Sequence, residues 1–172
     1  MIANRFVPLE TTAVGIRARD QETAQTVLLV DVRHLDARLV GVVHPALISV
    51  FAIVEDGGRA LAATEFVQGR SLKDLFGGEP CHPRRAAEIV SELADGVAEL
   101  HARGVVHGNI TQASAMLTTK GKARLMLTSA IGGDEILDLN ALRLVLKTIG
   151  GQPTPEAEAA QSAPVLAALL RA

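Results

Sequence analysis

The chain has 172 residues, 48% of them hydrophobic and 21% charged, and a formal net charge of −2. This length suits one domain with a real core, and the mixed charges give no basic field to hold a nucleic-acid backbone. With four Phe and no Tyr or Trp, the chain also lacks the aromatic platforms on which most proteins stack single-stranded bases. We therefore expect a folded protein that does not bind nucleic acid.

The single cysteine, Cys81, excludes an internal disulfide and a cysteine-based zinc cluster, which fits a reducing compartment. No apolar run approaches 18 residues, and the N-terminus lacks the long apolar stretch of a signal peptide. The sequence therefore predicts a cytoplasmic chain without a membrane segment of its own, either free or as the cytosolic domain of a membrane protein.

Residues 5–67 have the pattern of short strands separated by turns. The pair of strands joined through Asp56-Gly57-Gly58 predicts a hairpin. Segment 33–41 interrupts the strands but is too short for more than a turn or two of helix. We expect an antiparallel sheet of about five strands.

The periodicity changes from residue 71 onward. Residues 83–104 place apolar side chains at helical spacing, with Pro83 in the first turn and Gly104 just past the end, which predicts a long helix. Residues 114–128 predict a small hairpin, and residues 134–151 predict a second helix that ends at a pair of glycines. The Pro-rich residues 152–162 predict an exposed linker before a short helix that begins near residue 164.

These elements, in this order, carry motifs that resemble bacterial protein kinases of the eukaryotic-like Ser/Thr type. His44-Pro45, the stretch Glu65-Phe66-Val67 and then Gly69-Arg70-Ser71-Leu72 are similar to the family's fourth and fifth strands, hinge and following helix. Residues 86–110 resemble the long helix that runs into the catalytic loop. Residues 138–151 resemble the helix that anchors the larger lobe, with Asp138 at its characteristic acid.

The resemblance implies an α+β, protein-kinase-like two-lobe fold in a single domain, residues 1–172, with Val30 buried at the third strand. Its parts are a β-rich N-lobe (1–67), a helical C-lobe (68–151), and a linker with a short C-terminal helix (152–172). The fold is expected to be compacted, because the first-lobe helix, the activation segment and the final helices are short or missing.

Four motif positions depart from the family pattern, and the glycine-rich phosphate loop retains a single glycine. The family's strand lysine, catalytic aspartate, metal-binding asparagine and metal-binding aspartate fall on Val30, Asn109, Ser114 and Leu127. An aliphatic side chain cannot pair with phosphate, and an amide cannot accept a hydroxyl proton at a useful pH. The resemblance therefore predicts a pseudokinase with no catalytic residue, no cofactor and no metal.

The function predicted on this basis is a catalytically inactive scaffold that binds another protein in regulation and does not bind Mg-ATP. Two alternatives stay open: a nucleotide-binding allosteric sensor, and a structural appendage of a larger protein. As partner, the resemblance implies a phosphothreonine-reading forkhead-associated domain. Thr154, between two prolines in the predicted linker, is the candidate phosphosite, with a plain linker as the alternative.

Two polar groups of the catalytic-loop region are predicted to be structural. His107 is expected to bond to loop backbone rather than to form a metal pair with His101, because their spacing across a helix end is poor ligand geometry. Asp138 is expected to bond to the backbone of the same loop. Asp134 and Glu135 are expected to favour the positive end of a helix N-terminus.

Overall fold

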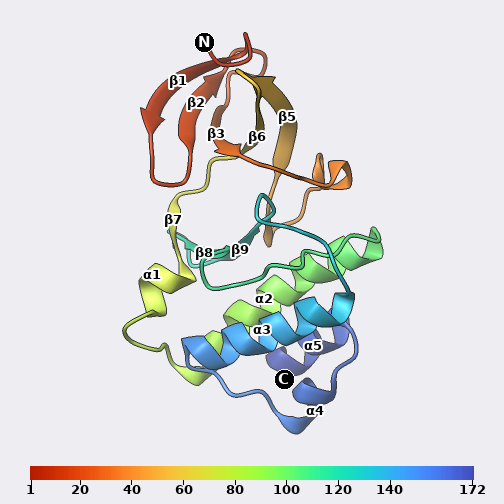
Figure 1. Cartoon of the computed structure of the whole chain (residues 1–172). Coiled ribbons are helices and arrows are strands. Elements are labelled where there is room, and N and C mark those ends of the chain that lie inside the picture. Colours follow the sequence, from red (N-terminus) through yellow and green to blue (C-terminus); the bar gives the residue numbers. More distant parts are fainter.

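The computed structural model describes residues 1–172 and has two lobes, one above the other in Figure 1. The upper lobe is a five-stranded antiparallel sheet with the strand order β1-β2-β3-β6-β5. Its strands are β1 (Phe6–Thr11), β2 (Ile16–Asp20), β3 (Thr26–Asp31), β5 (Val50–Asp56) and β6 (Arg59–Glu65). The predicted hairpin is β5–β6, where Gly57 and Gly58 adopt the positive φ angles that a tight hairpin turn requires.

Each face of the upper sheet belongs to a different hydrophobic cluster. One face forms a small core of its own, made of Phe6, Ala18, Val27, Leu29 and Ala63. The other face, which includes Ala62, joins the main core of the protein. The alternation of side chains along each strand places neighbouring residues of β3 and β6 on opposite faces.

The two lobes are connected by short elements. Between β3 and β5 the chain forms a 3-10 turn, η1 (Ala37–Leu39), where the predicted fold has a short or missing helix. A second sheet, with the order β4-β9-β8-β7, lies between the upper sheet and the helices. Its strands are β4 (Leu47–Ile48), β7 (Gly69–Ser71), β8 (Ala115–Thr118) and β9 (Ala123–Met126).

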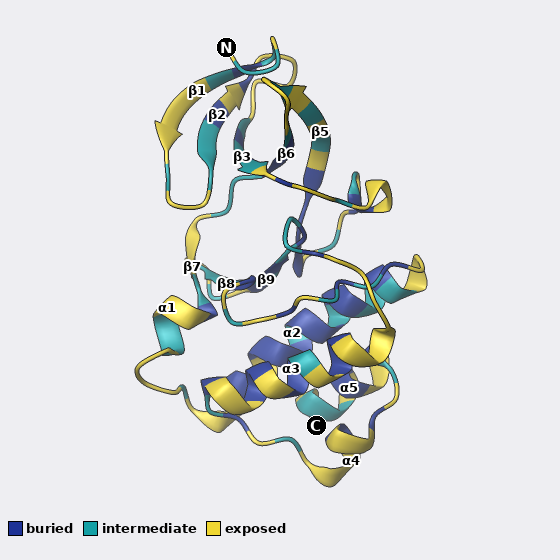
Figure 2. Ribbon diagram, viewed as in Figure 1, coloured by how far each residue is buried: buried dark blue, intermediate teal, exposed yellow.

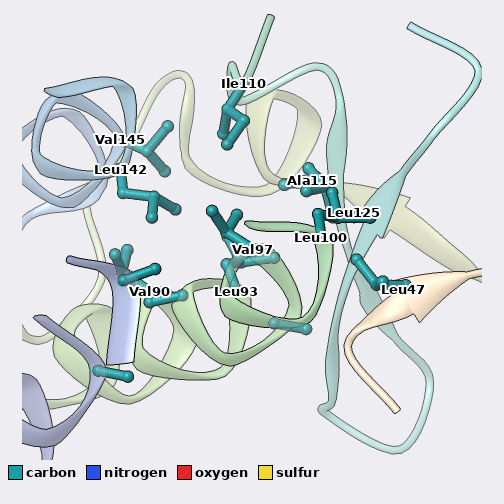
Figure 3. Packing of buried hydrophobic residues seen from close by; sticks show 14 of the residues in the cluster. Leu47, Val90, Leu93, Val97, Leu100, Ile110, Ala115, Leu125, Leu142 and Val145 are labelled. Atoms are coloured by element: carbon teal, nitrogen blue, oxygen red, sulfur yellow. The ribbon is translucent and has the colours of Figure 1, made fainter. Parts of the chain in front are cut away.

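The lower lobe is helical, and its helices are α1 (Leu72–Phe76), α2 (Pro83–Ala102), α3 (Glu135–Ile149), α4 (Pro155–Ala159) and α5 (Ala163–Arg171). Helix α2 packs against α3, α5 and β9. Figure 3 shows how Val90, Leu93 and Val97 of α2 meet Leu142 and Val145 of α3. In Figure 2 the inner faces of these helices are buried and their outer faces exposed. None of the helices combines the length and apolar character needed to cross a bilayer.

The ends of the two long helices follow local chemistry, and both predicted helices are confirmed. Helix α2 begins at Pro83 after the His82 cap, whose Nδ1 accepts a hydrogen bond from the backbone N–H of Arg84. Helix α3 begins after Asp134, whose carboxylate accepts from the N–H of Ile136. It ends at Gly150, which has a φ of 119°.

The prediction of an exposed linker over residues 152–162 is wrong in part, because the segment contains α4 and buries Ala157 and Ala160. Thr154 is the N-cap of this helix, and its Oγ1 accepts a hydrogen bond from the N–H of Ala157 at 3.2 Å. Pro155 occupies the first helical position, where a missing N–H does no harm. The Thr-Pro pair, interpreted as a linker signal, is therefore a helix start.

The C-terminal helices are bound to the rest of the lower lobe through buried polar groups. The guanidinium of Arg143, on α3, is almost fully buried and donates to the carbonyl oxygens of Ala157 and Ala160. Ser91 Oγ, on α2, donates to the carbonyl of Ala167 at 3.0 Å. Residues 155–171 are therefore an integral layer of the lower lobe.

Candidate functional site

A cleft of about 650 Å³ lies between the two lobes. Strand β3 and the turn before β2 line it from above, the small sheet and the segment after β9 line it from below, and residues 65–71 close one side. Its apolar lining residues are Val14, Leu28, Val30, Ile48, Phe66, Val67, Ala113, Met116, Met126 and Leu127. A cavity of this volume with an apolar lining and a few polar groups is typical of small-molecule and cofactor sites.

The segment that joins the lobes, residues 66–68, lines the cleft and contains backbone groups without a partner in the chain. The backbone N–H and C=O groups of Phe66 and Val67 make no hydrogen bond within the chain. Both residues line the cleft. The guanidinium of Arg17 lies 4.9 Å from the centre of the Phe66 ring and covers it from the β2 side. An apolar slot with free peptide groups on one edge can bind a flat, heteroatom-bearing ring.

The inner end of the cleft is uncharged. Val30 faces the cleft from β3 and is paired with Ala62 of β6, and Leu127 is buried below it. The prediction that Val30 is buried is wrong, because the open cleft leaves its side chain partly exposed. The cationic side chains that line the cleft, Arg70 and Lys73, are at its outer rim, on β7 and α1.

Below the cleft, the loop that begins at His107 is held by a buried carboxylate. Asp138, on α3, accepts hydrogen bonds from the backbone N–H groups of His107 (3.0 Å) and Gly108 (2.8 Å). His107 bonds through Nε2 to the carbonyl of Met126 at 2.8 Å, and its Nδ1 accepts from the N–H of Asn109. The structural roles predicted for His107 and Asp138 are confirmed. The bond between His101 Nε2 and Asp138, at 2.9 Å, was not predicted.

Burial and hydrogen bonding shift the pKa values of this pair. Burial lowers the pKa of His107 below its ordinary value, so the ring is neutral near pH 7. Burial raises the pKa of Asp138, but the hydrogen bonds from His101, Gly108 and His107 outweigh it, and the net pKa is lowered. The carboxylate is therefore ionised and fixes the loop at neutral pH.

The other predicted site residues of the loop are not brought together. Asn109 is exposed, and its Nδ2 donates to the carbonyl of Ser129 at 3.1 Å. Ser114 is buried, and its hydroxyl is consumed within the loop, where it donates to the carbonyl of Thr111 and accepts from the N–H of the same residue. The structure thus places Asn109 at the surface and Ser114 and Leu127 in the interior.

The kinase resemblance implies Mg²⁺, which takes oxygen ligands, above all carboxylates. The two positions that would supply these ligands hold Ser114, whose hydroxyl is already bonded, and Leu127, which has no oxygen in its side chain. No group of three or more His, Cys, Asp or Glu side chains in the chain could hold a metal ion. The residues at these positions therefore do not fit a magnesium ion.

Arg124 of β9 was not predicted as a functional residue, although its side chain contacts the hinge. It donates to both carboxylate oxygens of Glu65, at 2.6 and 3.2 Å, and to the carbonyl of Leu47. The signal was an arginine between apolar neighbours in a strand, which predicts a partly buried charge with a partner. The identity of that partner is not visible in the sequence.

No family model matches the chain. The curated relatives are bacterial Ser/Thr kinases. The serine/threonine-protein kinase pkn2 of Myxococcus xanthus is 33% identical over 95 residues, which are 53% of this chain and 11% of that protein. PkaB of Streptomyces coelicolor is 33% identical over 84 residues, covering 48% of this chain and 20% of that protein. PrkC of Bacillus subtilis is 22% identical over 103 residues, covering 58% and 16%. The aligned parts are thus a fifth or less of these relatives.

Among solved structures, the crystal structure of the Mycobacterium tuberculosis PknI kinase domain matches with a TM-score of 0.80. The match covers 99% of this chain and 96% of that chain, at 15% sequence identity. The chain therefore has a protein-kinase fold, and the predicted two-lobe α+β architecture is confirmed.

The comparisons overturn the functional prediction. The chain was expected to be a non-enzymatic scaffold, with a sensor or an appendage as the alternatives. That prediction is wrong, because the relatives are named as Ser/Thr protein kinases and the whole chain has a kinase-domain fold. The residues at positions 30, 109, 114 and 127 differ from the family motifs, but nothing in the relatives or in the fold shows that the chain is degenerate.

Proposed function

We propose that the chain is a nucleotide-binding domain of the Ser/Thr protein kinase type, which acts in phosphate transfer to protein hydroxyl groups. The observation that carries the proposal is the cleft between the lobes, with the free backbone groups of Phe66 and Val67 at its edge. We also propose a cytoplasmic location, which the single cysteine supports.

The base of a purine nucleotide suits this cleft for two reasons. Leu28 above and Met116 below offer apolar surfaces to the two faces of a flat ring. The ring edge can exchange hydrogen bonds with the peptide groups of Phe66 and Val67, which make no hydrogen bond within the chain. Each such bond contributes about 1 kcal/mol, so adenosine itself should bind measurably.

The uncharged inner end of the cleft limits the expected rate of phosphate transfer. Phosphoryl transfer passes through a loose transition state, in which positioning and charge stabilisation dominate. Asn109 can orient an acceptor hydroxyl but cannot accept its proton, and Val30 offers no charge to phosphate. Since removing one such electrostatic group lowers a rate by about 10²–10³-fold, we expect turnover far below the ~1–100 s⁻¹ of ordinary kinases.

The test measures binding and transfer on the same protein. Calorimetric titration with adenosine and ADP should give saturable binding, and Leu28→Trp, which fills the cleft, should abolish it. The matched control is Ile53→Trp, at a partly exposed position on edge strand β5 outside the cleft lining, and it should bind like wild type.

Transfer is followed with ATP labelled in the γ-phosphate and a Ser/Thr-rich acceptor protein, in the presence of Mg²⁺. Slow label transfer that Leu28→Trp removes and Ile53→Trp retains is the expected result. Absence of saturable binding in wild type would refute the proposal, and binding without any transfer would refute its catalytic part.

As a protein partner of the domain, we propose a phosphothreonine reader of the forkhead-associated type that binds Thr154 after its phosphorylation. The side chain is exposed at the start of α4, which supports access by a modifying kinase. A phosphate would add about −1.5 to −2 charges and could bond to an arginine-bearing reader. Capture of such a domain by the phosphorylated chain, but not by Thr154→Ala, is the expected result; equal capture would refute this pairing.

A further inference from the structure

Two stretches of chain connect the upper lobe to the lower one, and they run side by side. One contains β4 and enters β5, and the other leaves β6 for the hinge. Two hydrogen bonds join these neighbouring stretches. The N–H of Glu65 donates to the carbonyl of Ser49 at 2.9 Å, and the N–H of Ser49 donates to Glu65 Oε2 at 3.4 Å. The relative position of the lobes depends on how these two stretches are held.

A single guanidinium from the lower lobe binds both stretches. Arg124 donates from Nη2 to Glu65 Oε2 (2.6 Å) and from Nη1 to Glu65 Oε1 (3.2 Å). The same side chain donates from Nη2 and Nε to the carbonyl of Leu47, at 2.6 and 3.3 Å. Arg124 therefore ties the hinge and the β4 stretch to β9 at one point.

This contact differs from an ordinary surface ion pair. The side chain of Arg124 is 16% exposed and that of Glu65 is 35% exposed, so water screens the pair only in part. Two parallel charge-assisted bonds fix the direction of the carboxylate as well as its distance. A lysine has one nitrogen and cannot hold Glu65 and Leu47 in this fork geometry.

The guanidinium lies behind the hinge as seen from the cleft. It lines a second, open cavity together with Glu65 and Phe66, whereas it does not line the cleft itself. Arg124 thus cannot touch a ligand in the cleft, but it holds the residue that precedes Phe66 and Val67.

We infer that Arg124 is a positioning residue that sets the backbone groups of the hinge against the nucleotide base by gripping Glu65 and Leu47 from behind. The ligand part of this inference rests on the function proposed above. Losing the grip should leave the fold intact, because both lobes have their own cores, but should let the hinge sample other orientations.

The first test needs no nucleotide. Amide hydrogen exchange is measured on the whole chain for wild type, Arg124→Met, Glu65→Gln and the double variant. The matched control is Arg59→Met, which removes an exposed arginine of β6 whose nearest carboxylate oxygen is 3.9 Å away. Exchange of the hydrogen-bonded amides of Leu47, Ser49 and Glu65 should rise about tenfold or more in both single variants, without further gain in the double variant. Exchange unchanged relative to Arg59→Met would overturn the inference.

The second test uses ligand selectivity, which a general loss of stability would not change. Adenosine has an exocyclic amine that can donate to a hinge carbonyl, and purine riboside lacks it. Wild type should prefer adenosine by about tenfold, and Arg124→Met should reduce this ratio toward one, with Arg124→Lys restoring little of it. A ratio unchanged in Arg124→Met would overturn the positioning role.

The two tests separate the inference from the proposed function. If wild type binds neither nucleoside, the proposed function fails, while the exchange result still decides whether Arg124 fixes the hinge. If wild type binds adenosine and the exchange and ratio are both unaffected, the inference alone fails.

Discussion

Replacing Asp138 by Asn should destabilise the lower lobe, because the change puts an NH₂ group where one oxygen of a buried carboxylate accepts hydrogen bonds. The carboxylate is fully buried and accepts hydrogen bonds from His101 Nε2 and from the N–H groups of His107 and Gly108, at 2.8–3.0 Å. An amide has one acceptor oxygen, and its NH₂ group would face a donor. At least one buried donor is left without a partner.

The size of the effect follows from these bonds. Hydrogen bonds to a charged group contribute about 1.5–3 kcal/mol each, so losing one or two predicts a loss of about 2–5 kcal/mol in the free energy of unfolding. For a chain of this length, that corresponds to a fall of about 5–15 °C in Tm.

Urea and thermal unfolding of the purified chain measure this loss. Asp134→Asn is the control, because Asp134 is an exposed N-cap and asparagine caps helices about as well as aspartate, so its effect should stay within about 0.5 kcal/mol. An Asp138→Asn protein as stable as the control would refute the view that the carboxylate holds the loop.

Three further outcomes are expected. Because burial lowers the pKa of His107, the unfolded chain takes up a proton below about pH 6.5 that the folded chain does not, so stability should fall from there toward lower pH. In His107→Gln, urea midpoints between pH 7 and 5 should fall less steeply than in wild type, and parallel curves would contradict this. The hydrogen bonds from Arg5 hold the pKa of Asp20 well below its usual range, so this carboxylate stabilises the fold above about pH 4 and loses that effect as the pH falls further. Asp20→Asn should remove this pH-dependent part of the unfolding free energy. A loss of stability below pH 4 as steep as in wild type would contradict this. Gly108 has a φ of 75° and an added Cβ would collide with the carbonyl of Gly132, so Gly108→Ala should destabilise the chain by more than the roughly 1 kcal/mol expected for Gly41→Ala, whose φ is 81° and whose surroundings are open. Equal losses of unfolding free energy in these two variants would count against the close packing of the loop.

The fold could be predicted from the sequence because its evidence is local and ordered. The periodicity of residues 83–102 predicts α2 by itself, and the glycine-rich turn predicts β5–β6. Residues 152–162 were misassigned because a threonine between two prolines is typical of both a linker and a helix start. What decides in favour of the helix is the burial of Ala157 and Ala160 against distant residues.

The candidate site was less predictable because its contacts join distant parts of the chain. Arg124 meets partners that precede it by 59 and 77 residues. The apolar neighbours of Arg124 in its strand predict that its charge is partly buried, but they do not indicate which carboxylate binds it. The functional prediction failed for another reason: missing charges at Val30 or Asn109 indicate which interactions are absent, but not whether the remaining cleft supports chemistry.

The buried guanidinium of Arg143 has a consequence for how the protein is made. Its carbonyl partners belong to Ala157 and Ala160, which are synthesised after α3 is complete. Until those residues leave the ribosome, the guanidinium keeps only its bond to Asn140 Oδ1 on the same helix, and burying the charge in that state is strongly unfavourable. The lobe should therefore stay open until α4 has emerged, and a released chain that ends at residue 153 should fail to close its lower lobe although it contains both long helices.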